Sequence, residues 1–292
     1  MSEKMYAELA LKLECNVGEG PFWDDVKQDL YFVDIMNKQI KMFSPTSKLV
    51  ETVQFNQEIG AVFLDQKSNL IVAARDGIFA ATRDGVLDTL LAPIELEDTS
   101  IRTNDAKCDA YGRMWVGTMA FDFTPGVAAL FSFDSKVLKE VVPDLTVSNG
   151  IGWSLDKKTM YFIDSPAKRV DIFDVDLESG ELRNRRVFAS LTDLDAFPDG
   201  LTTDEDGGVW VALFGGGEVR RFDSQGTLTH IVEIPVKQVT SCCFGGGDMS
   251  DLYITTAQNG MDSDSLIREP LAGSLFRVKT SFKGSKSNRY GI

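Results

Sequence analysis

Short apolar runs separated by turns recur along the chain at a regular interval. Each repeat opens with a usually small or polar residue and an apolar run, passes through a turn rich in Asp and Gly, and reaches an apolar or aromatic pair. The openings lie near Glu19, Ile59, Asn104, Asn149, Asp199 and Thr240. The pairs begin at Leu30, Leu70, Met114, Met160, Val209 and Leu252, which gives spacings of 40, 44, 46, 49 and 43. This period predicts an all-β fold, a six-bladed β-propeller with blades of four antiparallel strands.

A further strand precedes the first repeat. Residues 8–14 alternate between polar and apolar positions, with leucines on one face. If this N-terminal strand pairs with the last blade near residues 273–278, it closes the ring and leaves no open sheet edge there. We therefore expect residues 1–292 to form a single six-bladed propeller domain. The tail after Lys279 is expected to be mostly exposed.

Tight turns are expected between the strands of each blade. Pairs such as Asp76-Gly77 and Asp206-Gly207 suit hairpin loops, because Gly adopts positive φ at little cost. No helical period is long enough to matter for the fold. The longest connections are expected at residues 121–127 and 191–197. Long loops on a rigid scaffold often cover a functional site.

Composition and charge restrict the partners. The 292 residues are 43% hydrophobic, and 44 acidic against 30 basic residues give a formal net charge of -14. Such a surface repels phosphate backbones and argues against nucleic-acid binding. There is no apolar stretch that could span a membrane and no secretory signal, and the four cysteines form no C-x-x-C pair. We expect a cytoplasmic protein with reduced thiols, no membrane partner, and a monomeric or weakly homo-oligomeric state.

The repeat openings supply candidate metal ligands. The innermost strands of a propeller run along its axis, so equivalent first residues point into the same end of the channel. Glu19, Asn104, Asn149 and Asp199 offer two carboxylates and two amide oxygens, which suit Ca²⁺, Mg²⁺ or Mn²⁺. The alternative is that Asn149-Gly150 and Asp199-Gly200 are ordinary turn dipeptides. The shared phase of four openings favours the metal site.

Several other chemistries are not supported. The only histidine, His230, lies in a predicted strand away from any repeat opening, so a catalytic triad lacks a positioned imidazole. The glycines at 215–217 are not followed by the Lys and Ser or Thr of a phosphate-binding loop. The segment that begins at Asp174 has Ser179 where a calcium-binding EF-hand loop needs Gly.

The motifs resemble one protein family over essentially the whole chain. They are V-G-E-G-P-F-W (17–23), R-T-N-D (102–105), G-T-M-A (117–120), S-N-G-I-G-W-S (148–154), P-D-G (198–200), T-S-C-C-F-G-G (240–246) and G-M-D-S-D-S-L (260–266). This set resembles the senescence marker protein-30 (regucalcin), gluconolactonase and luciferin-regenerating enzyme family. The resemblance implies a six-bladed propeller with one divalent metal ion, Ca²⁺ first and Zn²⁺, Mn²⁺ or Mg²⁺ as alternatives. It also implies a small-molecule lactone as substrate.

The resemblance assigns roles to individual residues. Glu19, Asn149 and Asp199 match the family's direct metal ligands. Arg102 and Asn104 match residues that hold the oxygens of the substrate. A metal-dependent lactonase of this type opens the ring with a metal-activated water, and Asp199 would take the proton from that water. Arg102 would orient the substrate and stabilise developing negative charge. Its alternative role is a surface salt bridge.

One departure from the family pattern concerns the substrate. A carboxylate in the loop after G-T-M-A touches sugar hydroxyls in the animal lactonases, and Asp122 is the matching candidate here. Those members have two glutamates where this chain has Phe121-Asp122. An apolar residue followed by Asp is closer to the luciferin-regenerating branch and favours a less polar ligand.

Four alternatives remain open at this point. The same oxygen cage would serve a regucalcin-like calcium-binding regulatory protein. A luciferin-regenerating-type enzyme would share the fold and the metal. Phosphotriester hydrolysis is a conceivable side activity. A plain interaction propeller is the fourth, and the carboxylates of Glu19 and Asp199 at the channel mouth count against it.

Overall fold

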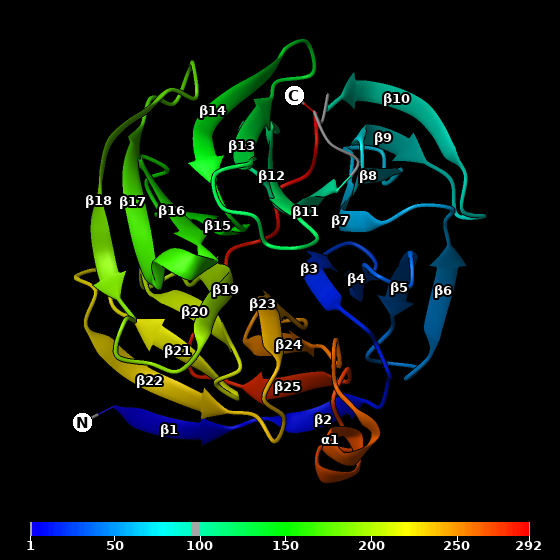
Figure 1. Cartoon of the computed structure of the whole chain (residues 1–292), viewed down its shortest axis with the longest axis vertical. Helices are drawn as coiled ribbons and strands as arrows, with labels where there is room; N and C mark the ends of the chain where they lie inside the picture. Colours follow the sequence, from blue (N-terminus) through cyan, green and yellow to red (C-terminus); the bar gives the residue numbers. More distant parts are fainter. Residues whose placement is uncertain (1, 95–99, 292) are drawn as a thin grey trace.

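The strands form six sheets around a common axis, and this confirms the predicted six-bladed propeller (Figure 1). The computed structural model describes residues 2–94 and 100–291. From the axis outwards, blade one contains β3 (Gly18–Asp24), β4 (Asp29–Asp34), β5 (Gln39–Phe43) and β6 (Val50–Gln54). Blade two contains β7 (Ile59–Leu64), β8 (Leu70–Ala74), β9 (Gly77–Ala81) and β10 (Leu87–Pro93). Blade three contains β11 (Ile101–Cys108), β12 (Met114–Ala120), β13 (Ala128–Phe133) and β14 (Leu138–Leu145).

The other three blades follow the same plan with two additions from the N-terminus. Blade four contains β15 (Ser148–Trp153), β16 (Thr159–Asp164), β17 (Arg169–Val175) and β18 (Leu182–Ser190). Blade five contains β19 (Phe197–Thr203), β20 (Val209–Phe214), β21 (Glu218–Phe222), β22 (Leu228–Glu233) and, outermost, β1 (Glu3–Tyr6). Blade six contains β23 (Val239–Gly245), β24 (Asp251–Thr256), β25 (Leu275–Lys279) and β2 (Glu8–Leu11). Two short helices are η1 (Ser165–Ala167) and α1 (Ser263–Arg268).

The N-terminal segment closes the ring as predicted and also extends a second blade. β2 pairs antiparallel with β25, with Leu9 opposite Phe276, so the first strands of the chain complete blade six. β1 pairs parallel with β22 of blade five, a contact that the sequence pattern did not reveal. Glu3 lies opposite His230 in this pairing, with 3.4 Å between the carboxylate and Nε2. The histidine therefore belongs to the outer part of the ring.

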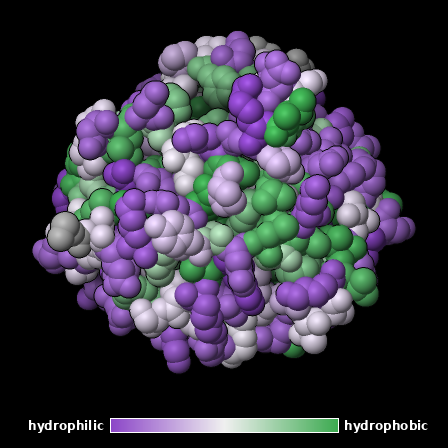
Figure 2. Space-filling model, turned by 90° about the horizontal axis from the view of Figure 1, so that it is seen from below, coloured by the Kyte–Doolittle hydropathy of each residue, from purple (hydrophilic) through white to green (hydrophobic). Residues whose placement is uncertain are grey.

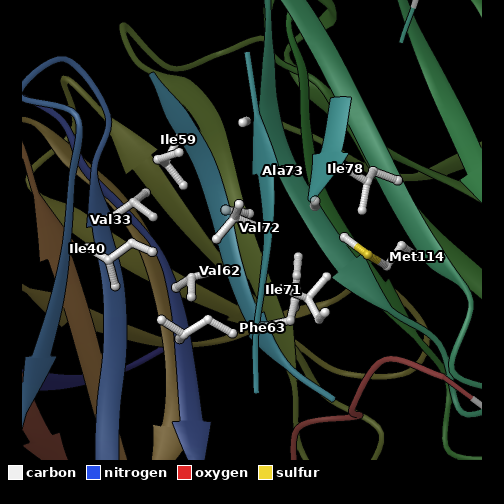
Figure 3. Close-up of a cluster of buried hydrophobic side chains, with 14 of the residues drawn as sticks. Val33, Ile40, Ile59, Val62, Phe63, Ile71, Val72, Ala73, Ile78 and Met114 are labelled. Carbon is white, nitrogen blue, oxygen red and sulfur yellow. The ribbon is translucent and has the colours of Figure 1, made fainter. Parts of the chain in front are cut away.

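Buried apolar side chains fill the spaces between neighbouring blades. In Figure 3, Val33 and Ile40 of blade one lie near Val62 and Val72 of blade two, and Met114 of blade three lies on the far side of them. All five residues of β8 are buried, because the second strand of a blade packs against a neighbour on each face. This explains the apolar pairs that mark the repeat. Burial of each large side chain stabilises the fold by about 1.5–3 kcal/mol.

The C-terminal tail is not exposed as expected, but lies across one end of the ring (red in Figure 1). The backbone N–H of Tyr290 donates to Leu64 O at 2.9 Å, and its ring stacks on Phe133 with 6.2 Å between centroids. Arg289 Nη2 lies 2.7 Å from Asp24 Oδ1. Polar and glycine-rich residues gave no strand period, so the sequence did not show these contacts.

The longest connection among these three lies in blade six, not at either of the two predicted positions. The loops at 121–127 and 191–196 are present, but the connection between β24 and β25, residues 257–274, is longer than either. It contains α1, which begins after Asp262. The Asp262 side chain accepts a hydrogen bond of 2.8 Å from the Ser265 backbone N–H and so caps the helix.

The outer surface is largely polar on the side that carries the N-terminal strands. Figure 2 shows this side, where hydrophilic residues predominate and hydrophobic residues gather in a smaller central area. Among the described residues, no helix combines the length and the apolar character that crossing a bilayer requires. All four cysteines are free and buried, as the sequence predicted.

Candidate functional site

Every innermost strand has a pairing irregularity near its first residues. The register to the second strand shifts between Glu19 and Phe22 in blade one and between Asn149 and Ile151 in blade four. Equivalent shifts in the other blades lie between Ile59 and Ala61, Thr103 and Ala106, Pro198 and Leu201, and Val239 and Ser241. Such bulges re-aim the neighbouring side chains. The repeat therefore turns polar groups toward the axis at one end of the ring.

The glycines that follow two of the candidate ligands belong to strands and not to turns. A Cβ on Gly150 would lie 2.7 Å from the carbonyl oxygen of Asp199. On Gly200 it would lie 2.0 Å from Ser241 Oγ. Glycine is needed because adjacent innermost strands approach closely here. The alternative that Asn149-Gly150 and Asp199-Gly200 are turn dipeptides is therefore wrong.

A chain of hydrogen bonds connects three blades at this end of the ring. Arg102 Nη1 donates to Asn104 Oδ1 at 2.8 Å, and Asn104 Nδ2 donates to Asn149 Oδ1 at 2.8 Å. Asn149 Nδ2 then donates to Ser165 Oγ at 2.8 Å, and that hydroxyl donates to Pro198 O at 2.7 Å. This series of hydrogen bonds ends at Pro198, one residue before Asp199. The hydrogen bonds fix the orientation of both Asn side-chain amides. They also connect residues that occupy equivalent positions in successive repeats of the sequence.

Three buried carboxyl groups, those of Glu19, Asp105 and Asp199, lie beside this series of hydrogen bonds. Burial, together with the charge of Asp105, raises the pKa of Glu19 to about 8. Burial raises the pKa of Asp105 to about 6. Burial, and then the charges of Glu19 and Asp105, raise the pKa of Asp199 well above its ordinary value. Burial and mutual repulsion therefore disfavour the charged forms of all three groups in the absence of a cation.

The donor set fits a divalent cation that prefers oxygen ligands. Glu19 Oε1 is buried and has no hydrogen-bond partner among the described residues, while Oε2 accepts from the Gly20 N–H. In the described part of the chain, no three Asp, Glu, His or Cys side chains form a metal-binding group by themselves. An ion here would thus depend on the amide oxygen of Asn149 as well as on Glu19 and Asp199. Carboxylate and amide oxygens are the ligands that Ca²⁺ takes.

Arg102 is the cation that belongs to the site. Its side chain is buried, so it does not form the surface salt bridge considered as its alternative role. Burial lowers the pKa of its guanidinium to about 10, while the charges of Glu19, Glu58 and Asp199 act in the opposite direction. Nη1 also donates to Thr103 O at 2.8 Å. Nε is buried and has no hydrogen-bond partner among the described residues.

The loop after β12 presents Phe121 to the site, whereas Asp122 lies on its exposed part. Asp122 Oδ1 accepts hydrogen bonds from the backbone N–H of Thr124 at 3.0 Å and from its hydroxyl at 2.7 Å. The Phe121 ring lies 5.7 Å from the guanidinium carbon of Arg102. The substrate contact of Asp122 thus stays a prediction.

Asp105 and Ser165 lie in this region without a role that was predicted from the sequence. Asp105 directly follows Asn104, and strict alternation in a strand would aim the two side chains to opposite faces. The bulge between Thr103 and Ala106 removes that alternation, and Asp105 lines a cavity of about 90 Å³ inside the ring. The acidic residue at the end of R-T-N-D was the available signal. Ser165 had none, because its role depends on η1 meeting Asn149.

The same cavity reaches from Asp105 to the C-terminal tail. Its wall includes Asp105, Lys107, Ser241 and, at the far end, Asn288 of the tail. Lys107 Nζ donates to Leu201 O at 2.8 Å within this region. The cavity lining does not include the three candidate metal ligands. The tail contacts the far ends of the innermost strands, so the candidate site and the tail lie at opposite ends of the ring.

Comparisons with known proteins show the family of the chain and agree with the observed fold. A family model described as the SMP-30/Gluconolactonase/LRE-like region matches residues 17–258. Regucalcin of Oryctolagus cuniculus is 36% identical over 278 residues, 93% of each chain. YvrE of Bacillus subtilis, provisionally named a sugar lactone lactonase, is 34% identical over 284 residues, 96% of this chain and 97% of that protein. The crystal structure of a calcium-binding protein, regucalcin, from Agrobacterium tumefaciens has a TM-score of 0.95 at 26% identity, covering 100% of this chain and 99% of that chain. The chain belongs to the SMP-30/gluconolactonase/LRE family.

Proposed function

We propose that this chain is a divalent-metal-dependent hydrolase of the gluconolactonase type, which opens a lactone ring and works as one propeller domain over residues 1–292. The observation that carries the proposal is the unpartnered, buried Oε1 of Glu19 among carboxyl groups whose pKa values are raised. Such a group is costly to keep without a ligand. Membership in a family that includes gluconolactonases, and the likeness to YvrE, support the lactone as substrate.

The metal would be held by Glu19, Asn149 and Asp199, with Asn104 close by. Ca²⁺ is the proposed ion, because the donors are all hard oxygens and the Agrobacterium relative is described as calcium-binding. When bound, the ion would polarise the lactone carbonyl and acidify a water molecule. Asn104 would hold the Asn149 amide in place through the hydrogen bond between them.

The chain's own residues would divide the remaining work. Asp199, whose carboxylate has a second oxygen, would accept the proton of the attacking water as general base. Arg102 would use its free Nε–H to orient the lactone and to stabilise the negative charge that develops on the carbonyl oxygen. Burial of both side chains strengthens these interactions, because little water competes for them.

A second candidate function is calcium binding without catalysis as the principal role. The similarity to proteins named regucalcin favours it, and it would use the same ligands. The two functions differ in what they predict for a lactone. A binding protein would take up the ion and leave the ring closed, whereas a lactonase would open the ring only with the ion present.

The deciding experiment measures lactone hydrolysis by acid release in metal-depleted and metal-restored protein. A panel of δ-gluconolactone, an aromatic lactone and a fluorophosphate covers the proposed and the side activities. Hydrolysis that depends on Ca²⁺ or Mn²⁺ is expected, and Asp199→Asn should lower kcat by about 10²–10⁴-fold at saturating metal. Asp206→Asn, in a turn at the other end of β19, is the control and should keep full activity. Calcium binding without hydrolysis of any panel member would favour the second candidate.

A further inference from the structure

Two phenylalanine side chains lie next to residues of the candidate site. Phe121 directly follows β12 and lies against Arg102, and Phe197 is the first residue of β19, two residues before Asp199. Phe197 is 45% exposed, and Phe121 is half-buried. We refer to Phe121 and Phe197 as the mouth phenylalanines. Large apolar side chains gathered beside a polar site are typical of ligand contacts.

Both mouth phenylalanines are held in place by cations. The Phe121 ring lies 6.0 Å from the guanidinium carbon of Arg75 and 5.7 Å from that of Arg102. The Phe197 ring lies 4.8 Å from Lys168 Nζ, which also donates to Leu194 O at 2.9 Å. Cation–π contacts of this kind fix the orientation of a ring. The rings are thus preorganised surfaces and not loose side chains.

This surface suits an apolar group better than a sugar. Sugar hydroxyls that leave water need hydrogen-bond partners, and a phenyl ring offers none. The carboxylate of Asp122 does not supply these hydrogen-bond partners, because it already accepts two hydrogen bonds from Thr124 on the exposed part of the loop. An aromatic or alkyl group laid against Phe121 or Phe197 would instead gain contact area and ring stacking.

We propose that the mouth phenylalanines make this protein selective for a lactone with an aromatic or alkyl substituent over a polyhydroxylated sugar lactone. The metal and Arg102 would act on the lactone ring, while the substituent would lie against Phe121 and Phe197. This inference rests on the proposed lactonase function and adds the class of substrate. Phe121 and Phe197 would determine specificity and would take no part in the proton transfer.

The test compares kcat/KM for γ-phenyl-γ-butyrolactone with kcat/KM for δ-gluconolactone in metal-loaded protein. The wild type should prefer the phenyl lactone. Phe121→Ala and Phe197→Ala should each lower this preference about tenfold. Phe121→Leu, which keeps an apolar side chain, should lose less than Phe121→Ala. Tyr111→Ala is the matched control, because Tyr111 is also an exposed aromatic residue on a guanidinium, 5.2 Å from Arg113, but follows the other end of β11.

Three results would overturn the inference. They are a wild type that prefers δ-gluconolactone, a preference that Phe121→Ala leaves unchanged, and an equal change in Tyr111→Ala. If no lactone is hydrolysed, the proposed function fails and the selectivity is tested by calorimetry with the ring-opened phenyl hydroxy acid. Binding that weakens in Phe121→Ala but not in Tyr111→Ala would support the role of the phenylalanines. No binding to the wild type would refute it.

Discussion

Asn104 Nδ2 donates a hydrogen bond of 2.8 Å to Asn149 Oδ1, and this bond joins blade three to blade four at the candidate metal site. Asn149 in turn donates to Ser165 Oγ, so both ends of its amide are engaged. Its oxygen therefore has a defined direction and one lone pair left for an ion. The metal site that we propose depends on this orientation as much as on the carboxylates.

Asn104→Ala should weaken binding of a divalent ion although it removes no proposed ligand. Loss of a residue that orients a ligand typically costs about 10–100-fold in metal affinity. Ser165→Ala removes the partner at the other end of the Asn149 amide and should have an effect of the same kind. Calorimetric titration with Ca²⁺ measures both. Unchanged affinity in the two variants would show that the hydrogen-bond chain does not position a ligand.

Metal-free protein should become less stable as the pH rises from about 4.5 to about 8. The pKa of Glu19 is raised from 4.5 to about 8 and that of Asp105 to about 6, so the folded state keeps protons that the unfolded state has released. Each such group lowers the free energy of unfolding as the pH rises from its ordinary pKa to its raised pKa, so Asp105 contributes up to about pH 6 and Glu19 up to about pH 8. Urea unfolding in chelator should show the decline, and saturating Ca²⁺ should remove it. A flat profile in chelator would contradict the raised pKa values.

Arg289→Ala should destabilise the fold by about 3–5 kcal/mol, because it leaves the fully buried Asp24 carboxylate without its ion pair. The matched control is Arg186→Ala, which breaks a pair with Asp174 whose side chains are 48% and 46% exposed. Exposed pairs contribute little, so urea unfolding should barely change in the control. Equal stability of the two variants would mean that the tail does not stabilise the end of the ring opposite to the candidate site.

Arg102→Lys should lower kcat/KM for a lactone by about 10²-fold while metal affinity changes much less. Lysine keeps the charge but cannot donate to Asn104 and to a substrate through one planar fork. Steady-state kinetics and calcium titration on the same samples separate the two effects. A loss of metal affinity as large as the loss of kcat/KM would place Arg102 among the residues that hold the ion.

The six-bladed architecture was predictable because apolar pairs recur at a regular spacing along the sequence. The second strand of each blade is buried on both faces, so its apolar pair appears at every repeat, as at Leu70 and Met114. The closing strand was predictable for the same reason, since residues 8–14 alternate. The parallel pairing of Glu3–Tyr6 with blade five was not, because a four-residue edge strand carries no apolar period of its own.

The grouping of the candidate ligands was predictable, but the detail of their surroundings was not. The phase of the repeat and the family resemblance pointed to Glu19, Asn149 and Asp199, and the structure brings all three to one end of the ring. Asp105 could not be placed, because a bulge breaks the strand alternation from which its direction could have been predicted. The contacts of Arg289 connect residues far apart in the sequence, and no local pattern records them.

The most direct test of the metal site is a calcium titration of the wild type and Glu19→Gln, with Glu205→Gln in a turn at the other end of β19 as control. Glu19→Gln keeps the shape of the side chain but removes the charge of a buried ligand. One ion should bind per wild-type chain, the control should match it, and Glu19→Gln should bind about 10²-fold or more weakly. Equal affinity in all three proteins would contradict the assignment of Glu19, and with it the site at this end of the ring.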